Sequence, residues 1–417
     1  MSAPEIVTEQ ARLDELCRAW RSADLIAFDT EFIRDDTYDA ALCLVQVAAS
    51  GDVVLIDPMA GLSVAPFWEL VCDPAITTVI HAGKEDFEVC LRSTGKPPRN
   101  IFDVQIAAGF VGLGYPLSLT RLVSAVAQKR VSKGQTLSDW TRRPLTRDQL
   151  RYAVEDVVHL PRVHELLRRQ LEERGRTAWA REEFARFEDP ELYRPPTEER
   201  VLKLKGSSKL DGLGLAALAR LVEWRDRWAK EKNRPIRALI RDDILVEIAR
   251  RRPNKPSDLE VLRGFPQARN PKIIREILDV LGEARALPKS DLPVPETPRE
   301  ESPMQRAVLD LLSAATRAVC HDEELSHELV GGSQRLRELL DYAGGVTREA
   351  PLLLSGWREQ FIGGRLMELL AGRCEIHLAG TPREPHVRLV PHGRGATRAS
   401  ETHRQRPGPV PRAASEG

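Results

Sequence analysis

The stretch LIAFDTEF, residues 25–32, joins an apolar run to two carboxylates that lie two positions apart. Side chains at i and i+2 of a β-strand project from one face, so Asp29 and Glu31 are expected to point together. Charges this close repel unless a cation lies between them. The apolar run is typical of sheet core, which leaves two interpretations open: a solvated strand end or half of a metal site.

The sequence around this strand predicts an α/β domain with a mixed sheet over residues 1–175. Residues 42–49 and 53–57 are strand-like and flank Ser50-Gly51-Asp52, which is typical of a hairpin connection. Residues 77–81 predict a further strand. Helical patterns follow at 85–92, 105–111 and 119–126, and one long helix is expected from Thr146 to about Arg174.

Two later segments supply further acidic residues. Asp86 follows a strand and a glycine turn, where the ordinary interpretation is a favourable charge at a helix N-terminus. Tyr152 and Asp156 are four residues apart and share a helix face. Four carboxylates in this order are what two Mg²⁺ ions require, because Mg²⁺ prefers oxygen ligands and two such ions can clamp an in-line phosphoryl displacement. A tyrosine one turn before the last aspartate can orient the attacking water.

Charge and cysteine content limit the class of protein. The 417 residues hold 62 basic and 62 acidic side chains, but residues 1–175 hold 20 and 25, so an acidic part precedes a basic part. The 42% hydrophobic content excludes a disordered chain. Six scattered cysteines without a CxxC pair predict buried, reduced thiols with no disulfide partner. We found no signal peptide and no membrane-length apolar run, so a soluble, cytoplasmic protein without a membrane partner is expected.

Composition divides the rest of the chain. Residues 176–205 are charged and contain proline, which predicts a linker with helical ends, and residues 206–288 are predicted to be helical throughout. Residues 289–303 are a second, Pro-rich linker. Residues 304–379 predict a second all-helical domain, and residues 380–417 predict a disordered basic tail.

Four ordered segments resemble the exonuclease motifs of the DEDD superfamily: FDTEF (28–32), HAGKEDFE (81–88), NIFDVQIAAGF (100–110) and YAVED (152–156). The Tyr-x3-Asp spacing marks the DEDDy branch, and residues 133–156 are similar to the ribonuclease D family in particular. The resemblance implies a ribonuclease H-like fold and 3′→5′ release of nucleoside 5′-monophosphates from RNA. It implies that two Mg²⁺ (or Mn²⁺) ions are held by Asp29, Glu31, Asp86 and Asp156, with Tyr152 positioning the water.

The same resemblance implies substrate contacts for Phe32, His81 and Gln105. Strand packing for Phe32 and a hydrogen-bonded core position for His81 are the ordinary alternatives. Lys133 and Arg143 are expected to contact phosphates, against an alternative of solvated loop charges. The motif that contains Gln105 has Val104 where the family has threonine, so no hydroxyl role is expected there.

Residues 206–288 resemble an HRDC domain, a helical nucleic-acid-binding module, and carry a group of cations between Arg225 and Lys255. Residues 304–379 resemble a second, HRDC-like domain. The expected partner is RNA with a single-stranded 3′ end, with tRNA precursors implied by the resemblance. Two rivals stay open, a DNA 3′→5′ exonuclease and an inactive nucleic-acid-binding scaffold. The sequence does not fix the oligomeric state, and a monomer is the default expectation.

Overall fold

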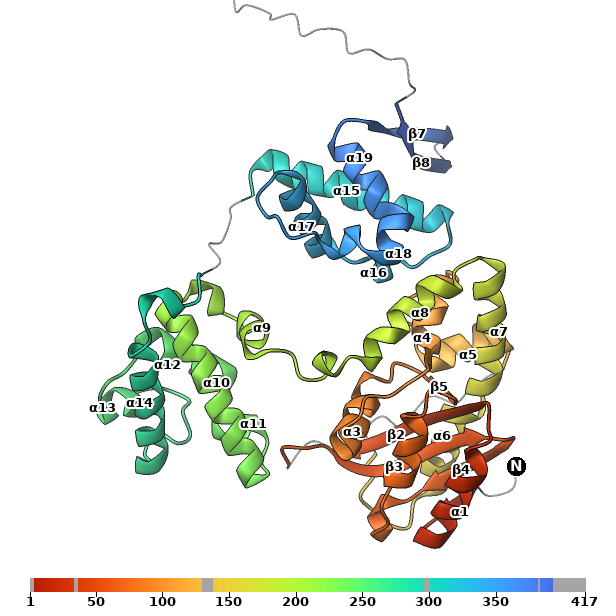
Figure 1. The fold of residues 1–417 in the computed structure, drawn as a ribbon, viewed down its shortest axis with the longest axis horizontal. Helices are drawn as coiled ribbons and strands as arrows, with labels where there is room; N and C mark the ends of the chain where they lie inside the picture. Colours follow the sequence, from red (N-terminus) through yellow and green to blue (C-terminus); the bar gives the residue numbers. More distant parts are fainter. Residues whose placement is uncertain (1–3, 34–36, 130–137, 296–300, 382, 393–417) are drawn as a thin grey trace, which may run out of the picture.

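The computed structural model describes residues 4–33, 37–129, 138–295, 301–381 and 383–392 (Figure 1). Its N-terminal domain is built on a six-stranded sheet with the order β1-β4-β3-β2-β5-β6. β2 runs antiparallel to β3 and parallel to β5, which confirms the predicted mixed sheet. The strands are β1 (Glu5–Val7), β2 (Leu25–Ile33), β3 (Ala41–Ala49), β4 (Asp52–Ile56), β5 (Thr77–Ile80) and β6 (Ile101–Asp103).

Helices cover both faces of this sheet. Phe28 lies on the face covered by α2 and α3, where its ring packs edge-on at 5.4 Å from Phe67 and 6.0 Å from Phe87. On the other face α6 contacts β2, β3 and β4. Side chains alternate along a strand, so this packing turns Asp29 toward the α6 side. The helices are α1 (Gln10–Trp20), α2 (Ala65–Val71), α3 (Lys84–Thr94), α4 (Val104–Phe110), α5 (Leu119–Ala127), α6 (Arg147–Val158) and α7 (Leu160–Glu173).

The single helix predicted from Thr146 to Arg174 is wrong, because the structure has two. α6 ends at Val158 and α7 begins at Leu160. Pro161 lies in the first turn of α7, and a proline there has no N–H to continue the α6 hydrogen bonds. The predicted start is confirmed: Thr146 caps α6 in a capping box with Gln149.

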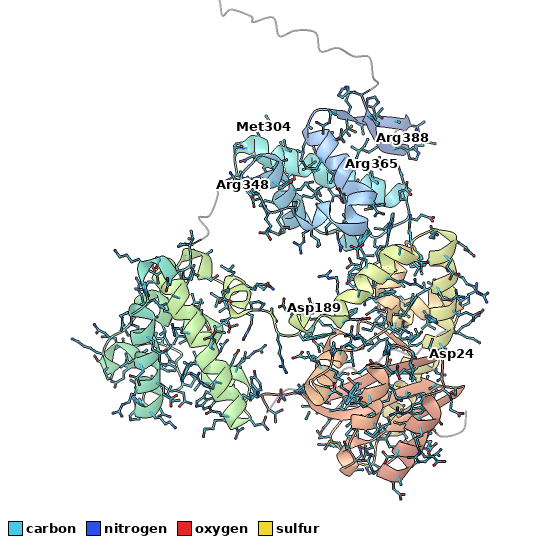
Figure 2. The ribbon with its side chains drawn as sticks, viewed as in Figure 1. Asp24, Asp189, Met304, Arg348, Arg365 and Arg388 are labelled. Carbon is cyan, nitrogen blue, oxygen red and sulfur yellow. The ribbon has the colours of Figure 1, made fainter. Side chains whose placement is uncertain are left out.

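The segment predicted as a linker with helical ends over 176–205 is only partly a connection. α8 (Thr177–Ala185) and the turns after it pack on the N-terminal domain, with the Phe184 ring 4.9 Å from Phe102 and the Phe187 ring 5.4 Å from Phe87. Figure 2 places Asp189 where the chain leaves this domain toward α9 (Thr197–Leu202). Aromatic residues in a charged segment explain the difference, since they bury against a core that the local sequence does not show.

A middle helical region follows, with its own hydrophobic core (Figure 1). Its main helix, α10, ends at Lys232, and Asn233 beyond it accepts a hydrogen bond from the Tyr38 N–H, in the connection between β2 and β3, at 3.3 Å. The region therefore touches the N-terminal domain beside the end of β2. Its helices are α10 (Gly212–Lys232), α11 (Ile236–Leu239), α12 (Asp242–Arg251), α13 (Pro256–Glu260) and α14 (Pro271–Arg285).

The C-terminal region is not all-helical, and the predicted disordered tail does not begin at residue 380. Strands β7 (Cys374–Thr381) and β8 (Glu384–Pro391) form an antiparallel hairpin. Cys374 and Leu389 are buried, which anchors the hairpin, and Pro391 stands at a strand end, where proline is tolerated. Residues 393–417 lie outside the described part. The preceding helices are α15 (Pro303–Asp322), α16 (His327–Val330), α17 (Ser333–Ala343), α18 (Gly356–Arg358) and α19 (Gly364–Leu370), with a π-helical turn at Glu359–Gly363.

This C-terminal region shares one hydrophobic core with the N-terminal domain. Trp357 packs edge-on against Phe110 at 4.9 Å and donates to the Glu183 carboxylate at 2.8 Å. The Arg358 guanidinium pairs with the same carboxylate at 2.5 Å, and both side chains are only 6% exposed. Arg358 also donates to the backbone carbonyl of Leu329. The two regions are therefore joined through a desolvated ion pair that α8 supplies.

We predict that Glu183→Gln destabilises the chain by about 3–5 kcal/mol, because the Arg358 charge would stay buried without its partner. Burial alone would raise the pKa of Glu183, but the bonds from Arg358 and Trp357 lower it below 4.5. The stabilisation is therefore complete at neutral pH and is lost as the pH falls below about 4.5. Melting temperatures of the wild type and of Glu183→Gln, measured from pH 7 to pH 3, should therefore differ most at pH 7 and converge at low pH. Glu172→Gln, in an exposed pair with Arg168, is the matched control and should change little.

Candidate active site

Two elements bring three carboxylates together. β2 carries Asp29 and Glu31, and α6 carries Asp156. One carboxylate oxygen from each residue lies within 4.8 Å of the others. All three side chains are half-buried, so solvent reaches the group while protein surrounds most of it. The structure thus assembles three of the four predicted acidic residues into a group that could hold a metal ion.

Asp86 lies on α3 and contacts β2 at Thr30. β2 pairs with β5 only over Leu25–Ala27, so this contact lies beyond the paired stretch, in the first turn of α3. The Thr30 hydroxyl donates to Asp86 Oδ1 at 2.5 Å in a buried position. The charge of Asp86 raises the pKa of Asp29, so Asp86 belongs to the same electrostatic unit. The sequence analysis did not select Thr30, although a threonine between two acidic residues of the strand could have indicated a role at this site.

Burial is the main cause of raised pKa values in this group. It raises the pKa of Glu31 to about 8, with added repulsion from Asp156 and Asp86. It raises the pKa of Asp156 to about 7 and of Asp86 to about 6, in each case against an opposing hydrogen bond. Asp29 is shifted in the same direction by burial and by its acidic neighbours. Four negative charges at this place therefore need a compensating positive charge.

One oxygen of the group has no partner. Asp156 Oδ2 is buried and accepts no hydrogen bond in the described structure. A buried carboxylate oxygen without a partner is costly, and a bound cation would satisfy it. This unpaired acceptor and the repulsion within the acidic group both fit a hard divalent ion, whose preferred ligands are carboxylate oxygens.

Tyr152 lies one turn before Asp156 and is hydrogen-bonded to it. Burial and the surrounding carboxylates raise the pKa of its hydroxyl, so the group stays protonated at neutral pH. Its ring packs on Trp140 at a centroid distance of 6.0 Å. The phenol is therefore a fixed neutral group beside the carboxylates, as the i, i+4 spacing predicts.

His81 and Gln105 meet at one backbone carbonyl. His81 Nε2 lies 2.8 Å from the Leu117 oxygen, and Gln105 Nε2 donates to the same oxygen at 3.1 Å. Both side chains are half-buried and hold the segment at Leu117 in place. This arrangement matches the ordinary alternative given for His81, and substrate contact by either residue stays a prediction.

The contacts of Arg143 contradict its predicted role. Its Nε and one terminal nitrogen donate to the two Asp57 oxygens, each at 2.6 Å. The remaining donors reach the backbone carbonyls of Cys43, Trp140 and Arg142. All five N–H groups of this guanidinium are thereby used within the protein, which leaves none for a phosphate.

Phe32 and Lys133 are the other two residues predicted to contact the substrate. Phe32 is half-buried and follows a register shift in the pairing of β2 with β3. Its contact with the terminal nucleotides stays a prediction. Lys133 lies outside the described residues. Within the described part of the chain, no helix has the length and apolar content needed to cross a membrane.

Comparisons with known proteins match both the domain that carries this site and the middle helical region. A family model described as 3′-5′ exonuclease matches residues 4–172, and an HRDC domain model matches residues 214–281. Ribonuclease D of Granulibacter bethesdensis is 35% identical over 91% of this chain and 95% of its own length. Ribonuclease D of Gluconacetobacter diazotrophicus is 33% identical over the same shares.

A solved structure extends the likeness to the arrangement of the chain. The crystal structure of Escherichia coli RNase D, described as an exoribonuclease involved in structured RNA processing, matches with a TM-score of 0.78 and 28% identity. The match covers 88% of this chain and 98% of that one. With these relatives along nine tenths of its length, the chain belongs to the ribonuclease D family of 3′-5′ exoribonucleases.

Proposed function

We propose that this chain shortens structured RNAs from single-stranded 3′ ends, such as those of tRNA precursors, and releases nucleoside 5′-monophosphates. The observation that carries the proposal is the group of Asp29, Glu31 and Asp156 with its unpaired Asp156 oxygen, beside a protonated Tyr152. The family relationship supports RNA as the substrate class.

Asp29, Glu31, Asp86 and Asp156 would hold two Mg²⁺ (or Mn²⁺) ions. Such ions, when bound, would supply the positive charge that stabilises the attacking and leaving oxygens of the phosphoryl displacement. Tyr152 donates its proton toward Asp156 and keeps a lone pair, which can accept a hydrogen bond from the attacking water and orient it. Thr30 fixes Asp86 through its hydroxyl, which keeps the fourth carboxylate at the end of β2.

The helical regions supply the expected RNA contacts. The chain beyond residue 175 has a net charge of +5, against −5 before it. The middle region touches the connection that follows β2, where the Tyr38 N–H donates to the Asn233 side chain. Clustered cations bind phosphates without reading sequence, which suits an enzyme that removes any terminal nucleotide.

We predict that Asp29→Asn or Asp156→Asn lowers exonuclease turnover by more than ~100-fold, since even groups behind a metal ligand contribute 10- to 100-fold. The assay follows mononucleotide release from a hairpin RNA with a single-stranded 3′ tail, in Mg²⁺. Asp148→Asn, an exposed change on α6, is the control and should keep full activity. Faster degradation of the matched DNA hairpin would instead favour a DNA exonuclease.

A second prediction concerns stability without metal. Since the pKa values of Glu31 and Asp156 are raised to about 8 and about 7, their ionisation costs the folded state more than the unfolded one. Stability in a chelator therefore falls as the pH rises from about 5 to 8. Added Mg²⁺ should raise the melting temperature most at pH 8.

Asp29→Asn tests the same cause by a different route. It should raise the melting temperature in chelator, because one of the repelling charges is gone, and it should reduce the shift produced by Mg²⁺. A variant less stable than wild type in chelator would contradict a contribution of charge repulsion to the raised pKa values. Asp148→Asn again serves as the control.

For Tyr152→Phe we expect turnover to fall by roughly 10- to 100-fold, near the lower end of what proton-handling groups contribute. KM should change little, because the ring and its packing on Trp140 remain. The Mg²⁺-induced melting shift should also remain, which separates loss of water orientation from loss of metal binding. Unchanged turnover would remove Tyr152 from the mechanism.

A further inference from the structure

Two cysteines lie side by side between α2 and α3. Cys72 caps the C-terminus of α2, and Cys90 lies in the middle of α3. Their sulfur atoms are 3.7 Å apart. A disulfide bond needs about 2.05 Å, so the two atoms would have to approach by less than ~2 Å. All six cysteines fall within the described residues, and all are free thiols.

The two thiols have unequal surroundings. Cys72 is half-buried, and the neighbouring Cys90 thiol lowers its pKa to about 7, with further help from Thr94 and Lys96. Cys90 is fully buried, and its pKa is raised by Cys72 and by burial. Thiolates, not thiols, attack oxidants, and exposure sets their access. Cys72 is thus suited to react first and Cys90 to follow. Burial raises the pKa values of Cys17 and Cys320, which makes them poorer nucleophiles.

We propose that Cys72 and Cys90 are a peroxide-sensitive pair that forms a reversible disulfide and thereby slows the nuclease. The Cys72 sulfur attacks one oxygen of hydrogen peroxide, the O–O bond breaks, and a sulfenic acid and one water result. The Cys90 sulfur then attacks the Cys72 sulfur, the S–S bond forms, and a second water leaves. Two thiols are oxidised while one peroxide is reduced to two waters, and an added dithiol reverses the bond.

The effect on activity follows from the helix that carries Cys90. Asp86 lies four residues before Cys90 on α3, so both project from the same face of the helix on neighbouring turns. Drawing Cys90 toward the end of α2 pulls on this helix and on the Asp86–Thr30 contact. A 1 Å misplacement in an active site can cost 100-fold in rate. This step rests on the proposed role of Asp86, whereas disulfide formation does not.

The experiment uses the full-length protein, reduced and then treated with hydrogen peroxide. Remaining thiols are alkylated, peptides are mapped by mass spectrometry, and RNA hydrolysis in Mg²⁺ is measured on the same samples. We expect a Cys72–Cys90 disulfide, an activity at least about tenfold lower, and recovery of activity after dithiothreitol. Cys72→Ser and, independently, Cys90→Ala should keep their activity through the treatment. Cys320→Ser, also a buried cysteine, should respond as wild type does.

The readouts separate the possible failures. Two alkylated thiols in peroxide-treated wild type would overturn the proposal, and so would equal loss of activity in Cys72→Ser. A mapped disulfide with unchanged activity would overturn the link to Asp86. Failure of the proposed nuclease function would show earlier, as a reduced protein that releases no mononucleotide, while the disulfide map would still be readable.

Discussion

Repulsion among the carboxylates at the end of β2 is the constraint on which the rest of this structure depends. Asp29, Glu31 and Asp156 approach within 4.8 Å, and Asp86 adds a fourth charge from α3. Such a group cannot hold itself together, so its backbone must be fixed by other interactions. The aromatic packing of Phe28 on the opposite face of β2 does this, because it anchors the strand from which two of the acids project.

The sequence predicted this group because its spacings are local. An i, i+2 pair on a strand and an i, i+4 pair on a helix have fixed geometry, so Asp29 with Glu31 and Tyr152 with Asp156 could be placed without a structure. The contacts of Arg143 could not be predicted, because its partner Asp57 is 86 residues away and no local pattern indicates the pair. The break at Pro161 is a different case: its signal was local, but the helical periodicity on both sides concealed it.

The contrast between local and long-range contacts also explains the errors in the predicted domain organisation. Phe184 and Phe187 sit in a segment whose charge is typical of a linker, yet their burial depends on α3 and β6, far away in sequence. The ion pair of Glu183 with Arg358 spans 175 residues. A C-terminal region that appears from composition to be a separate module is in fact part of the N-terminal core, whereas the middle region keeps a core of its own.

The zero net charge of the chain follows from this arrangement and does not argue against RNA. The excess of acid before residue 175 includes the four carboxylates, whose raised pKa values show that they are not simply solvated charges. Two divalent ions would offset that excess and leave the positive charge of the helical regions to act on phosphates. α3 is important here because it carries both Asp86, which contributes to the charge of the site, and Cys90, which packs against α2. A displacement of that helix would therefore act on the charge balance of the site as well as on its geometry.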